Sequence, residues 1–407
     1  MQSHSPQQFL TQLGQALSAD KLSVGFLLGA GCPCSIKVES SDGSKTSLID
    51  DIKGLTSKID KSARQDPEVG AAYEKLDAAF KQDGVFGPNI EVILNRIRAL
   101  REVAGSSDVR GLSFAELDGL DKTICQHIRN AVSARFDESE SPYRALARFL
   151  RHRKAPQSEV FTTNYDLLME RALEAERVPF FDGFVGSSTP FFDQRAIEDD
   201  KLPSRWARLW KLHGSVNWRI KAGGDRRVVR SEDCDEGDEL LIHPSHMKYD
   251  ESRRMPYFVM IDRLRAFIRN SERPVALFVV GYSFSDQHLN EAIVESLRYN
   301  ASSTCFAIQF GNLEEYKDGV ALAQSVNNLC LAARDGAILR RRYGAWLADP
   351  ATDIGALSAA FSAAQGKHEA GPNGLLPCEL HLGDFKQLGD FLDQYAHFGV
   401  SNTEAYE

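Results

Sequence analysis

The hydrophobic positions near the start of the chain follow a helical period and then form a continuous run. The helical spacing predicts a helix over residues 5–19. The apolar positions with this spacing are Phe9, Leu10, Leu13, Ala16 and Leu17. The next apolar run predicts a strand over residues 23–28, and it breaks at Gly29-Ala30-Gly31, where a backbone can turn and be approached closely.

A long helical pattern with charged interruptions follows, from about residue 48 to residue 152. In the segment NIEVILNRIRAL one face is apolar. That face carries Ile90, Ile93, Leu94, Ile97 and Leu100. The segment YRALARFLRHR ends in cationic residues, which favour the end of a helix. We therefore expect a large helical insertion at about 48–152.

Strand patterns return after the insertion, in the segments SEVFTTNYD, WARLWKLHGSVNW, VALFVVGYSFSD and STCFAIQFGN. We expect the second of these to be a short strand that ends at Gly214. The charged, glycine-bearing residues 221–239 predict a solvated loop or a small excursion of the chain. The tail from about residue 345 is expected to be partly helical, with breaks at glycine and proline.

Strands that alternate with helices predict an α/β fold with a Rossmann-like, mostly parallel sheet covered by helices on both faces. We assign residues 1–345 to one catalytic domain and residues 346–407 to a C-terminal extension that is a candidate partner or oligomer contact. Ligands of such sheets bind outside the carboxyl ends of the strands. The expected strand ends carry Gly29–Gly31, Thr162–Asp166, His213-Gly214, Gly281–Ser283 and Gly311-Asn312.

Composition narrows the class of protein. The chain has 407 residues, 43% of them hydrophobic, and a formal charge of −9, which argues against a general nucleic-acid coat. No apolar run reaches the length of a membrane span, and the polar start of the chain is unlike a signal peptide. The seven cysteines are scattered, as in a reducing cytosol. Cys32 and Cys34 lack the spacing of a zinc knuckle, and we expect them to be loop residues beside a ligand.

The glycines at two strand ends are candidates for contact with phosphates. Backbone N–H groups around Gly29–Gly31 could approach a pyrophosphate, and Gly281 with the hydroxyl of Ser283 could do the same. Other interpretations stay open: an ordinary tight turn at the first site, and a helix N-cap by Ser285 or Asp286 at the second.

Polar side chains at two further strand ends are candidates for catalysis. The amide of Asn164 could hold a water or a ribose hydroxyl, and Asp166 could accept a hydrogen bond from an amide or hydroxyl. His213 carries an imidazole suited to proton transfer near neutral pH. The alternatives are an Asx-turn at Asp166 and a structural histidine at 213.

The motifs GAG…S, TTNYD, LHGSVNW and GYSFSD, in this order, resemble the sirtuin superfamily, and more its bacterial NAD-hydrolysing branch than its deacylases. The resemblance implies that Asn164 and His213 are catalytic. It assigns contacts with the NAD substrate to Gly29, Ala30, Gly31, Ser35, Thr163, Asp166, Gly281, Tyr282, Ser283, Asp335 and Gly336.

One departure from the deacylases concerns zinc. They carry two Cys-x-x-Cys pairs between the histidine and the GYS equivalent, whereas this interval holds only Cys234. A four-cysteine zinc site cannot be built from it, so no zinc or other metal is expected. The zinc module frames the acyl-peptide cleft in deacylases, and its absence puts peptide deacylation in doubt.

The resemblance implies an NAD glycohydrolase of the bacterial cytoplasm that releases nicotinamide and ADP-ribose, as an NAD-depleting effector of anti-phage defence. It also implies control by a homo-oligomer and by a HerA-type hexameric ATPase partner, with an Argonaute-type partner as the alternative. Three other classes stay open: an NAD-dependent deacylase or ADP-ribosyltransferase, a non-catalytic NAD or ADP-ribose sensor, and a nuclease. The sequence shows no obvious carboxylate cluster for a two-metal nuclease.

Overall fold

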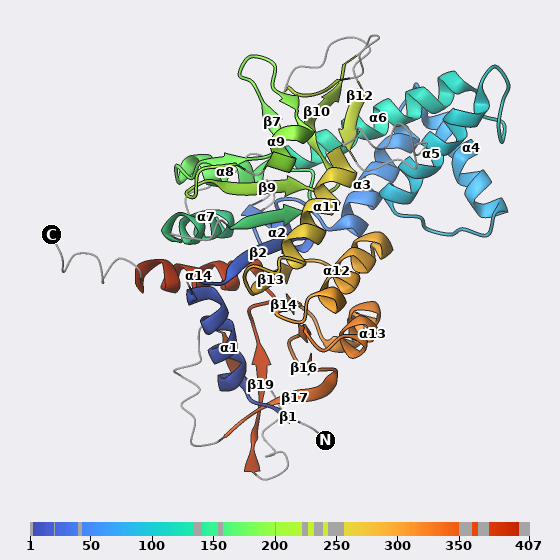
Figure 1. Ribbon diagram of the computed structural model, residues 1–407. Helices are drawn as coiled ribbons and strands as arrows, with labels where there is room; N and C mark the ends of the chain where they lie inside the picture. The colour runs from blue at the N-terminus through green and yellow to red at the C-terminus, as the bar shows by residue number, and fades with distance from the viewer. Residues whose placement is uncertain are drawn as a thin grey trace.

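The computed structural model describes residues 3–19, 21–39, 43–133, 141–153, 158–199, 201–221, 227–231, 239–242, 256–349, 360–364 and 374–398. Its centre is a sheet in which consecutive parallel strands run in the order β15, β14, β13, β2, β5, β9, β6 (Figure 1). Their bounds are Leu329–Ala332, Ser303–Ile308, Val275–Val280, Ser23–Leu28, Glu159–Thr162, Ala207–Lys211 and Phe180–Phe181. The predicted α/β fold with a mostly parallel sheet is confirmed.

The strand order reverses at β2. Chain connections after β2 lead first to β5, β6 and β9 on one side, and then to β13, β14 and β15 on the other. In open α/β sheets the crevice at such a reversal is where ligands bind. Gly29 follows β2 and Gly281 follows β13, so the two glycine segments lie at this crevice.

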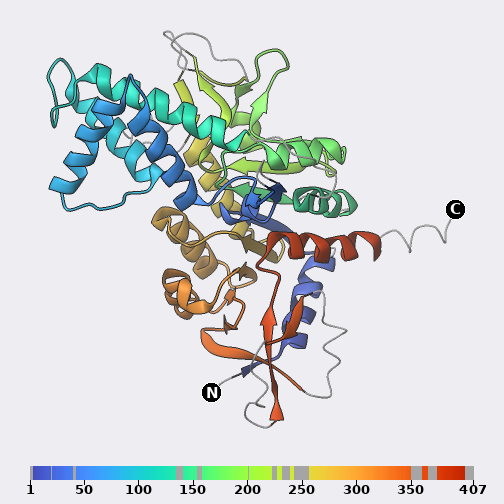
Figure 2. The ribbon, with the colours of Figure 1, turned by 180° about the vertical axis from the view of Figure 1, so that it is seen from behind.

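The C-terminal part of the chain extends the same sheet. Antiparallel strands β16 (Gly336–Leu339), β17 (Arg342–Ala348), β19 (Leu376–Leu380) and β18 (Phe361–Ala363) continue it beyond β15, and β1 (Ser3–His4) pairs with β17. Helix α14 (Phe385–Phe398) then returns along α7 (Pro142–His152), as Figure 2 shows. The described tail is therefore built into the main sheet and its helical cover.

Helices cover both faces of the sheet because successive strand residues point to opposite sides. Phe26 and Leu28 of β2 pack in the cluster that contains α1 (Pro6–Ser18), α7, α8 (Leu168–Ala175) and α14. Leu27 packs in the other cluster, with α11 (Pro256–Ile268), α12 (Gln287–Tyr299) and α13 (Lys317–Ser325). The predicted first helix and first strand are thus confirmed as α1 and β2.

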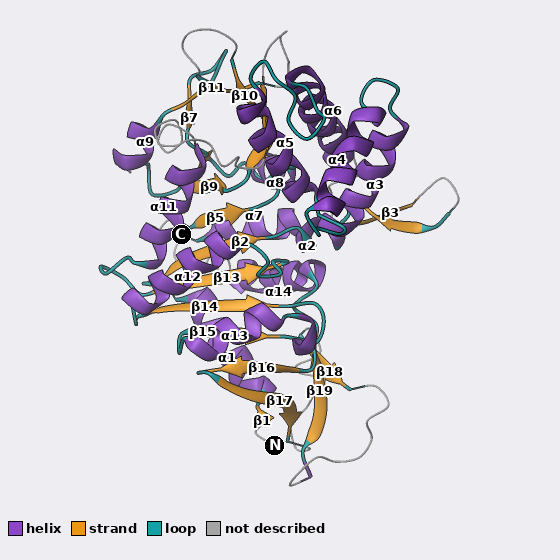
Figure 3. Cartoon of the chain, turned by 90° about the vertical axis from the view of Figure 1, so that its right-hand side faces the viewer, coloured by secondary structure: helices purple, strands orange, loops and turns teal. Residues whose placement is uncertain are grey.

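The predicted helical insertion is confirmed up to α6, whereas its last predicted helix, α7, packs on the sheet beside α8 and α14. Its helices are α3 (Ile52–Gln65), α4 (Gly70–Gln82), α5 (Ile90–Ala104) and α6 (Phe114–Val132). Figure 3 places it beside α2 (Gly31–Cys34), the single turn that follows β2. The insertion therefore stands at the carboxyl ends of the strands. None of the helices within the described ranges is both long and apolar enough to span a membrane.

The strand boundary expected after His213 is wrong. The strand predicted to end at Gly214 ends at Lys211, and Gly214, with a φ of 85°, begins a second strand, β10 (Gly214–Ile220). Part of the predicted loop at 221–239 is strand β11 (Val228–Arg230), because the apolar Val228 and Val229 are buried beside β10. Most of that loop, with Cys234, lies outside the described residues.

These strands belong to a second sheet, in the order β12, β10, β11, β8, β7. The remaining members are β12 (Glu239–Ile242), β8 (Phe191–Phe192) and β7 (Phe184–Val185). Short strands β3 (Lys37–Glu39) and β4 (Lys45–Ser47) pair with each other, and α9 (Gln194–Asp199) follows β8. This second sheet continues directly from His213 at the end of β9.

Candidate active site

A cavity of about 90 Å³ lies where β2, β5, β9 and β13 end. The predicted site residues that line it are Ala30, Thr163, Asn164, Asp166, His213, Gly281, Tyr282 and Ser283. The helical insertion and the segment before it form the opposite wall, with Ile49, Asp50, Ile52, Leu55, Asn89, Glu91 and Val132. The structure thus brings residues from four strand ends together, under a cover supplied by the insertion.

The glycines of the first and fourth motifs touch each other. Gly29 N donates to Val280 O at 2.9 Å, and Gly31 N donates to Gly281 O at 2.8 Å. A Cβ at Gly29 would lie 2.3 Å from the carbonyl oxygen of Gly281, so a side chain does not fit there. The glycines therefore allow two backbones to meet, and the N–H groups of Gly29 and Gly31 are used within the protein.

The short helix α2 buries the residues that follow this contact. Cys32 is fully buried, its thiol donates to Val280 O, and burial raises its pKa well above the ordinary value. The thiol of Cys34 bonds the carbonyls of Ala30 and Ile49, and burial raises its pKa to about 11. Ser35 donates to Cys32 O and is not among the residues that line the cavity. Both thiols are held protonated, Cys32 buried and Cys34 half-buried, and both lie on the helical turn α2 where a loop was expected.

Asn164 ties two strand ends together. Its backbone N–H donates to Thr162 Oγ1 at 3.0 Å, and its side-chain Nδ2 donates to Gly29 O at 3.1 Å. The hydroxyl of Thr162 in turn donates to Leu28 O at 3.0 Å. Asn164 is therefore buried and oriented by β2, with its amide at the wall of the cavity.

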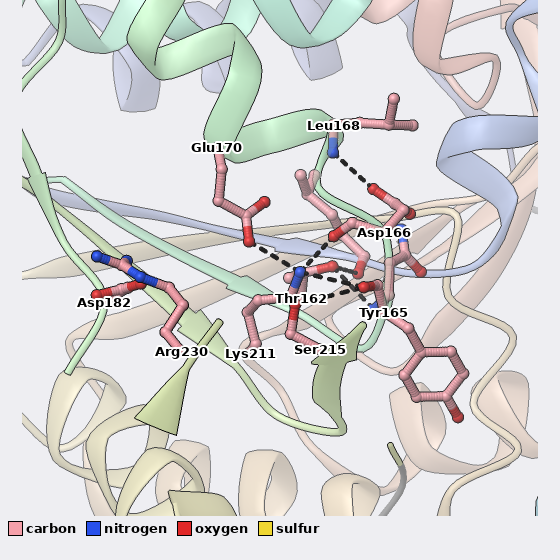
Figure 4. Close-up of polar contacts among 11 residues, drawn as sticks. Thr162, Tyr165, Asp166, Leu168, Glu170, Asp182, Lys211, Ser215 and Arg230 are labelled. Atoms are coloured by element: carbon pink, nitrogen blue, oxygen red, sulfur yellow. Dashed lines mark hydrogen bonds and ion pairs between the residues drawn. The ribbon is translucent and has the colours of Figure 1, made fainter. Parts of the chain in front are cut away.

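Asp166 closes a turn, as one of the sequence interpretations expects. Its Oδ1 accepts from Leu168 N at 2.9 Å, which is an Asx-turn at the start of α8. Below it, the buried Lys211 donates to the backbone carbonyls of Tyr165 and Asp166 and pairs with Glu170 at 2.9 Å (Figure 4). Burial raises the pKa of Asp166 to about 6, although the nearby Lys211 opposes this.

His213 lies between two carboxylates. Its Nε2 is 3.0 Å from Asp286 Oδ2, and its Nδ1 is 3.5 Å from Glu91 Oε1. Burial alone would lower the pKa of His213, but the hydrogen bond with Asp286 and the nearby carboxylate of Glu91 outweigh it and raise the pKa to about 9. The pKa of Asp286 is lowered despite its burial, because it accepts from His213. At neutral pH the imidazole is therefore protonated.

The sequence does not indicate that Asp286 or Glu91 is a partner of the histidine. Asp286 was expected at most to cap a helix, which it does: Oδ1 accepts from Leu289 N at 3.1 Å while Oδ2 faces His213. Glu91 stands in the first turn of α5, a position that favours an acidic residue in any helix. No signal in the sequence distinguishes it from an ordinary first-turn glutamate.

Asp335 and Gly336 lie away from this cavity. Asp335 Oδ1 accepts from Leu313 N at 3.0 Å, in the turn between β15 and β16, and Gly336 begins β16. They stand on the β14 side of the sheet, where the neighbouring Arg334 N donates to Gly311 O at 2.9 Å. Neither is among the residues that line the cavity.

Metal ligands are not gathered in the part of the chain that the structure describes: no group of three or more His, Cys, Asp or Glu there is placed to hold an ion. Of the charged residues that line the cavity, four are carboxylates, namely Asp50, Glu91, Asp166 and Asp286, and the fifth is His213. The cavity wall is therefore strongly acidic around one protonated imidazole.

Residues 158–326 match the SIR2-like domain family. This segment carries Asn164, His213 and Gly281–Ser283, and it leaves out the glycine loop at 29–31 and the helical insertion. No curated protein matches the chain.

Solved Sir2 structures are similar to the chain at a low level. One is a Sir2 homologue in complex with NAD, 16% identical, covering 78% of this chain and 88% of its own, with a TM-score of 0.35. Another is a Sir2 homologue mutant in complex with ADP-ribose, 13% identical, covering 73% and 84%, with a TM-score of 0.33.

Proposed function

We propose that the protein is an NAD glycohydrolase, which cleaves the bond between nicotinamide and ribose to give nicotinamide and ADP-ribose. The observation that carries this proposal is the meeting of Asn164 and His213 at one cavity, at the strand-order reversal beside β2. The match of residues 158–326 to the SIR2-like domain family supports it.

The acidic wall favours the nicotinamide end of NAD in this cavity. The nicotinamide ring carries a positive charge, and the four lining carboxylates attract it, whereas they repel phosphates. Lys and Arg are not among the described residues that line the cavity. We infer that the pyrophosphate lies against the uncharged part of the lining, at Ala30, Pro33 and Ser283.

The reaction breaks the bond from the ribose anomeric carbon to the ring nitrogen, and the electron pair neutralises the ring. Asn164 holds the water that attacks the cationic ribose, and a new carbon–oxygen bond forms. The water gives up one proton, which the carboxylate of Asp286 accepts, while the protonated His213 beside it orients the ribose and the water. No strong acid is needed, because the leaving group is already cationic.

We also propose that the enzyme acts in the bacterial cytoplasm as an NAD-depleting effector of anti-phage defence, controlled by a homo-oligomer and a HerA-type ATPase, with an Argonaute-type protein as the alternative partner. Exposed apolar side chains on the insertion support a partner surface there: Phe86 is 77% exposed, Val103 68% and Phe114 50%. Phe86 lies before α5, Val103 on α5 and Phe114 on α6, and large exposed apolar side chains of this kind are candidates for contact with another protein.

The test is a time course of NAD loss with the purified chain, alone and with the ATPase. Wild type is expected to release nicotinamide and ADP-ribose, and Asn164→Ala and His213→Ala to lower the rate by about 10² to 10⁴. Circular dichroism checks that the variants are folded. Unchanged NAD consumption in both variants would refute the proposal. Binding of NAD without turnover would indicate a sensor. Turnover only in the presence of an acylated or acceptor protein would indicate a deacylase or a transferase.

A further inference from the structure

The histidine of the candidate active site is held by a residue of the helical insertion. Glu91 Oε1 lies 3.5 Å from His213 Nδ1 and accepts a hydrogen bond of 2.6 Å from the hydroxyl of Tyr165. Tyr165 belongs to the strand-end motif that also carries Asn164, and it is buried. One carboxylate oxygen of the insertion thus contacts both His213 and Tyr165.

The position of Glu91 is fixed by its own helix. Asn89 caps α5 by accepting from Val92 N at 2.9 Å, and Ile90 N donates to Thr56 Oγ1 of α3 at 3.0 Å. Ile90 is buried at this end of the helix. The first turn of α5 therefore points at the cavity with its backbone groups already satisfied, and the glutamate side chain is the part that reaches the histidine.

The two carboxylates on the imidazole differ in what else they do. Asp286 is committed to capping α12 through Oδ1 and reaches Nε2 with its other oxygen. Glu91 reaches Nδ1, and a carboxylate on that nitrogen keeps it protonated and fixes the plane of the ring.

We propose that Glu91 is a positioning residue for His213, so that the helical insertion completes the catalytic centre and is not only a cover or a partner surface. This inference rests on the proposed NAD hydrolysis for its kinetic part alone. The geometry on which it depends is the shared contact of Glu91 with His213 and Tyr165.

The charged groups around the imidazole determine in which direction the pKa of His213 moves when Glu91 is replaced. The groups that face it are Glu91 on α5, Asp286 on α12, the hydroxyl of Tyr165 after β5 and, more distant along the wall, Asp50 and Asp166. Removing the charge of Glu91 leaves Asp286 as the close carboxylate while burial still opposes protonation.

The first experiment measures His213 directly, without NAD. The full chain is labelled with ¹³C-histidine, and the His213 signal is identified by its loss in His213→Gln. In Glu91→Gln, where the tyrosine can still donate to the amide oxygen, we expect the titration midpoint of His213 to fall by about one pH unit or more, a tenfold loss of proton affinity.

The matched control is Glu102→Gln, on the exposed side of the same helix α5, and its midpoint is expected to stay at the wild-type value. Thermal melting of both variants checks their folding. An unchanged His213 midpoint in Glu91→Gln would overturn the proposal, whether or not the protein consumes NAD.

The second experiment uses turnover. Glu91→Gln is expected to lower kcat by about tenfold or more with KM little changed, and to move the limb of the pH–rate profile that belongs to His213 to lower pH. A merely structural role would not move that limb. A wild-type kcat and an unchanged pH–rate profile in Glu91→Gln would contradict the inference. Absence of turnover in the wild-type protein would count against the proposed function. The role of Glu91 would then be decided by the titration of His213.

Discussion

The Nδ1 atom of His213 lies 3.5 Å from the carboxylate of Glu91, although the histidine follows a strand of the central sheet and the glutamate belongs to a separate helical insertion. This contact makes the insertion part of the site's chemistry. With Asp286 on the other ring nitrogen, the imidazole is held as a cation at neutral pH.

The stability of the protein should depend on the charge of His213. The pKa of His213 is raised to about 9 from an unfolded value near 6.5, so its contribution is complete below pH 6.5 and is lost as the pH rises through 9. The raised pKa of Asp166, about 6, lies below this window. We expect the free energy of unfolding to fall by up to about 3 kcal/mol between pH 6.5 and 9.

Urea denaturation at a series of pH values measures this fall. His213→Gln serves as the control, because it has no titrating group at this place and should lose most of the slope. An equal slope in both proteins would show that other groups cause it.

The contact between the two glycine segments should make Gly281 intolerant of a side chain. Its φ is 65°, and a Cβ would lie 2.6 Å from Cys32 N and 2.9 Å from Cys32 Sγ. We expect Gly281→Ala to lower the free energy of unfolding by about 1–2 kcal/mol for the backbone angle and about 1–3 kcal/mol more for the overlap.

Gly84→Ala isolates the overlap. Gly84 has a similar φ of 74° with no atom within 4 Å of the added Cβ, so it should show the backbone cost alone. Chemical denaturation of both variants gives the difference. Equal losses would mean that the close approach of the two backbones contributes nothing.

The buried Lys211 should contribute strongly to the stability of the strand ends below the cavity. Its side chain is 2% exposed and it binds two backbone carbonyls and the carboxylate of Glu170. Lys211→Met leaves these acceptors without their donor, and we expect a loss of about 3–5 kcal/mol in the free energy of unfolding.

Replacing Glu170 by Gln as well should restore part of this loss, because the isolated buried charge is removed. Lys122→Met is the comparison at the surface, where the lysine is 60% exposed and pairs with Asp118, and a change of about 0.5 kcal/mol or less is expected. The prediction fails if both lysine variants unfold at the same denaturant concentration.

The pattern of apolar positions was enough to predict the sheet and the gathering of its strand ends. Parallel strands end at one edge, so Asn164 and His213 were expected together, and the structure places both on one cavity. The strand boundary at Gly214 was wrong because an apolar run does not show where the chain turns into another sheet.

The contact between the insertion and His213 could not be predicted from the pattern of apolar positions. The helical period identifies Ile90, Ile93 and Leu94 as buried, which the structure agrees with, but it does not tell which strand ends the helix meets. Glu91 becomes visible only once α5 is docked. The glycine loop shows a related limit, since a close backbone approach and a phosphate contact need the same residue type.

The place of β2 at the middle of the sheet bears on how the chain is made. Leu28 accepts a hydrogen bond from Thr162, which comes 134 positions later, and Cys32 donates to Val280, which comes 248 positions later. During synthesis on a ribosome, β2 emerges before its neighbours β5 and β13. Helix α1 and the insertion are therefore made while β2 is still unpaired. We infer that the central sheet can be completed only after β13, which ends at Val280, has been synthesised and can pair with β2.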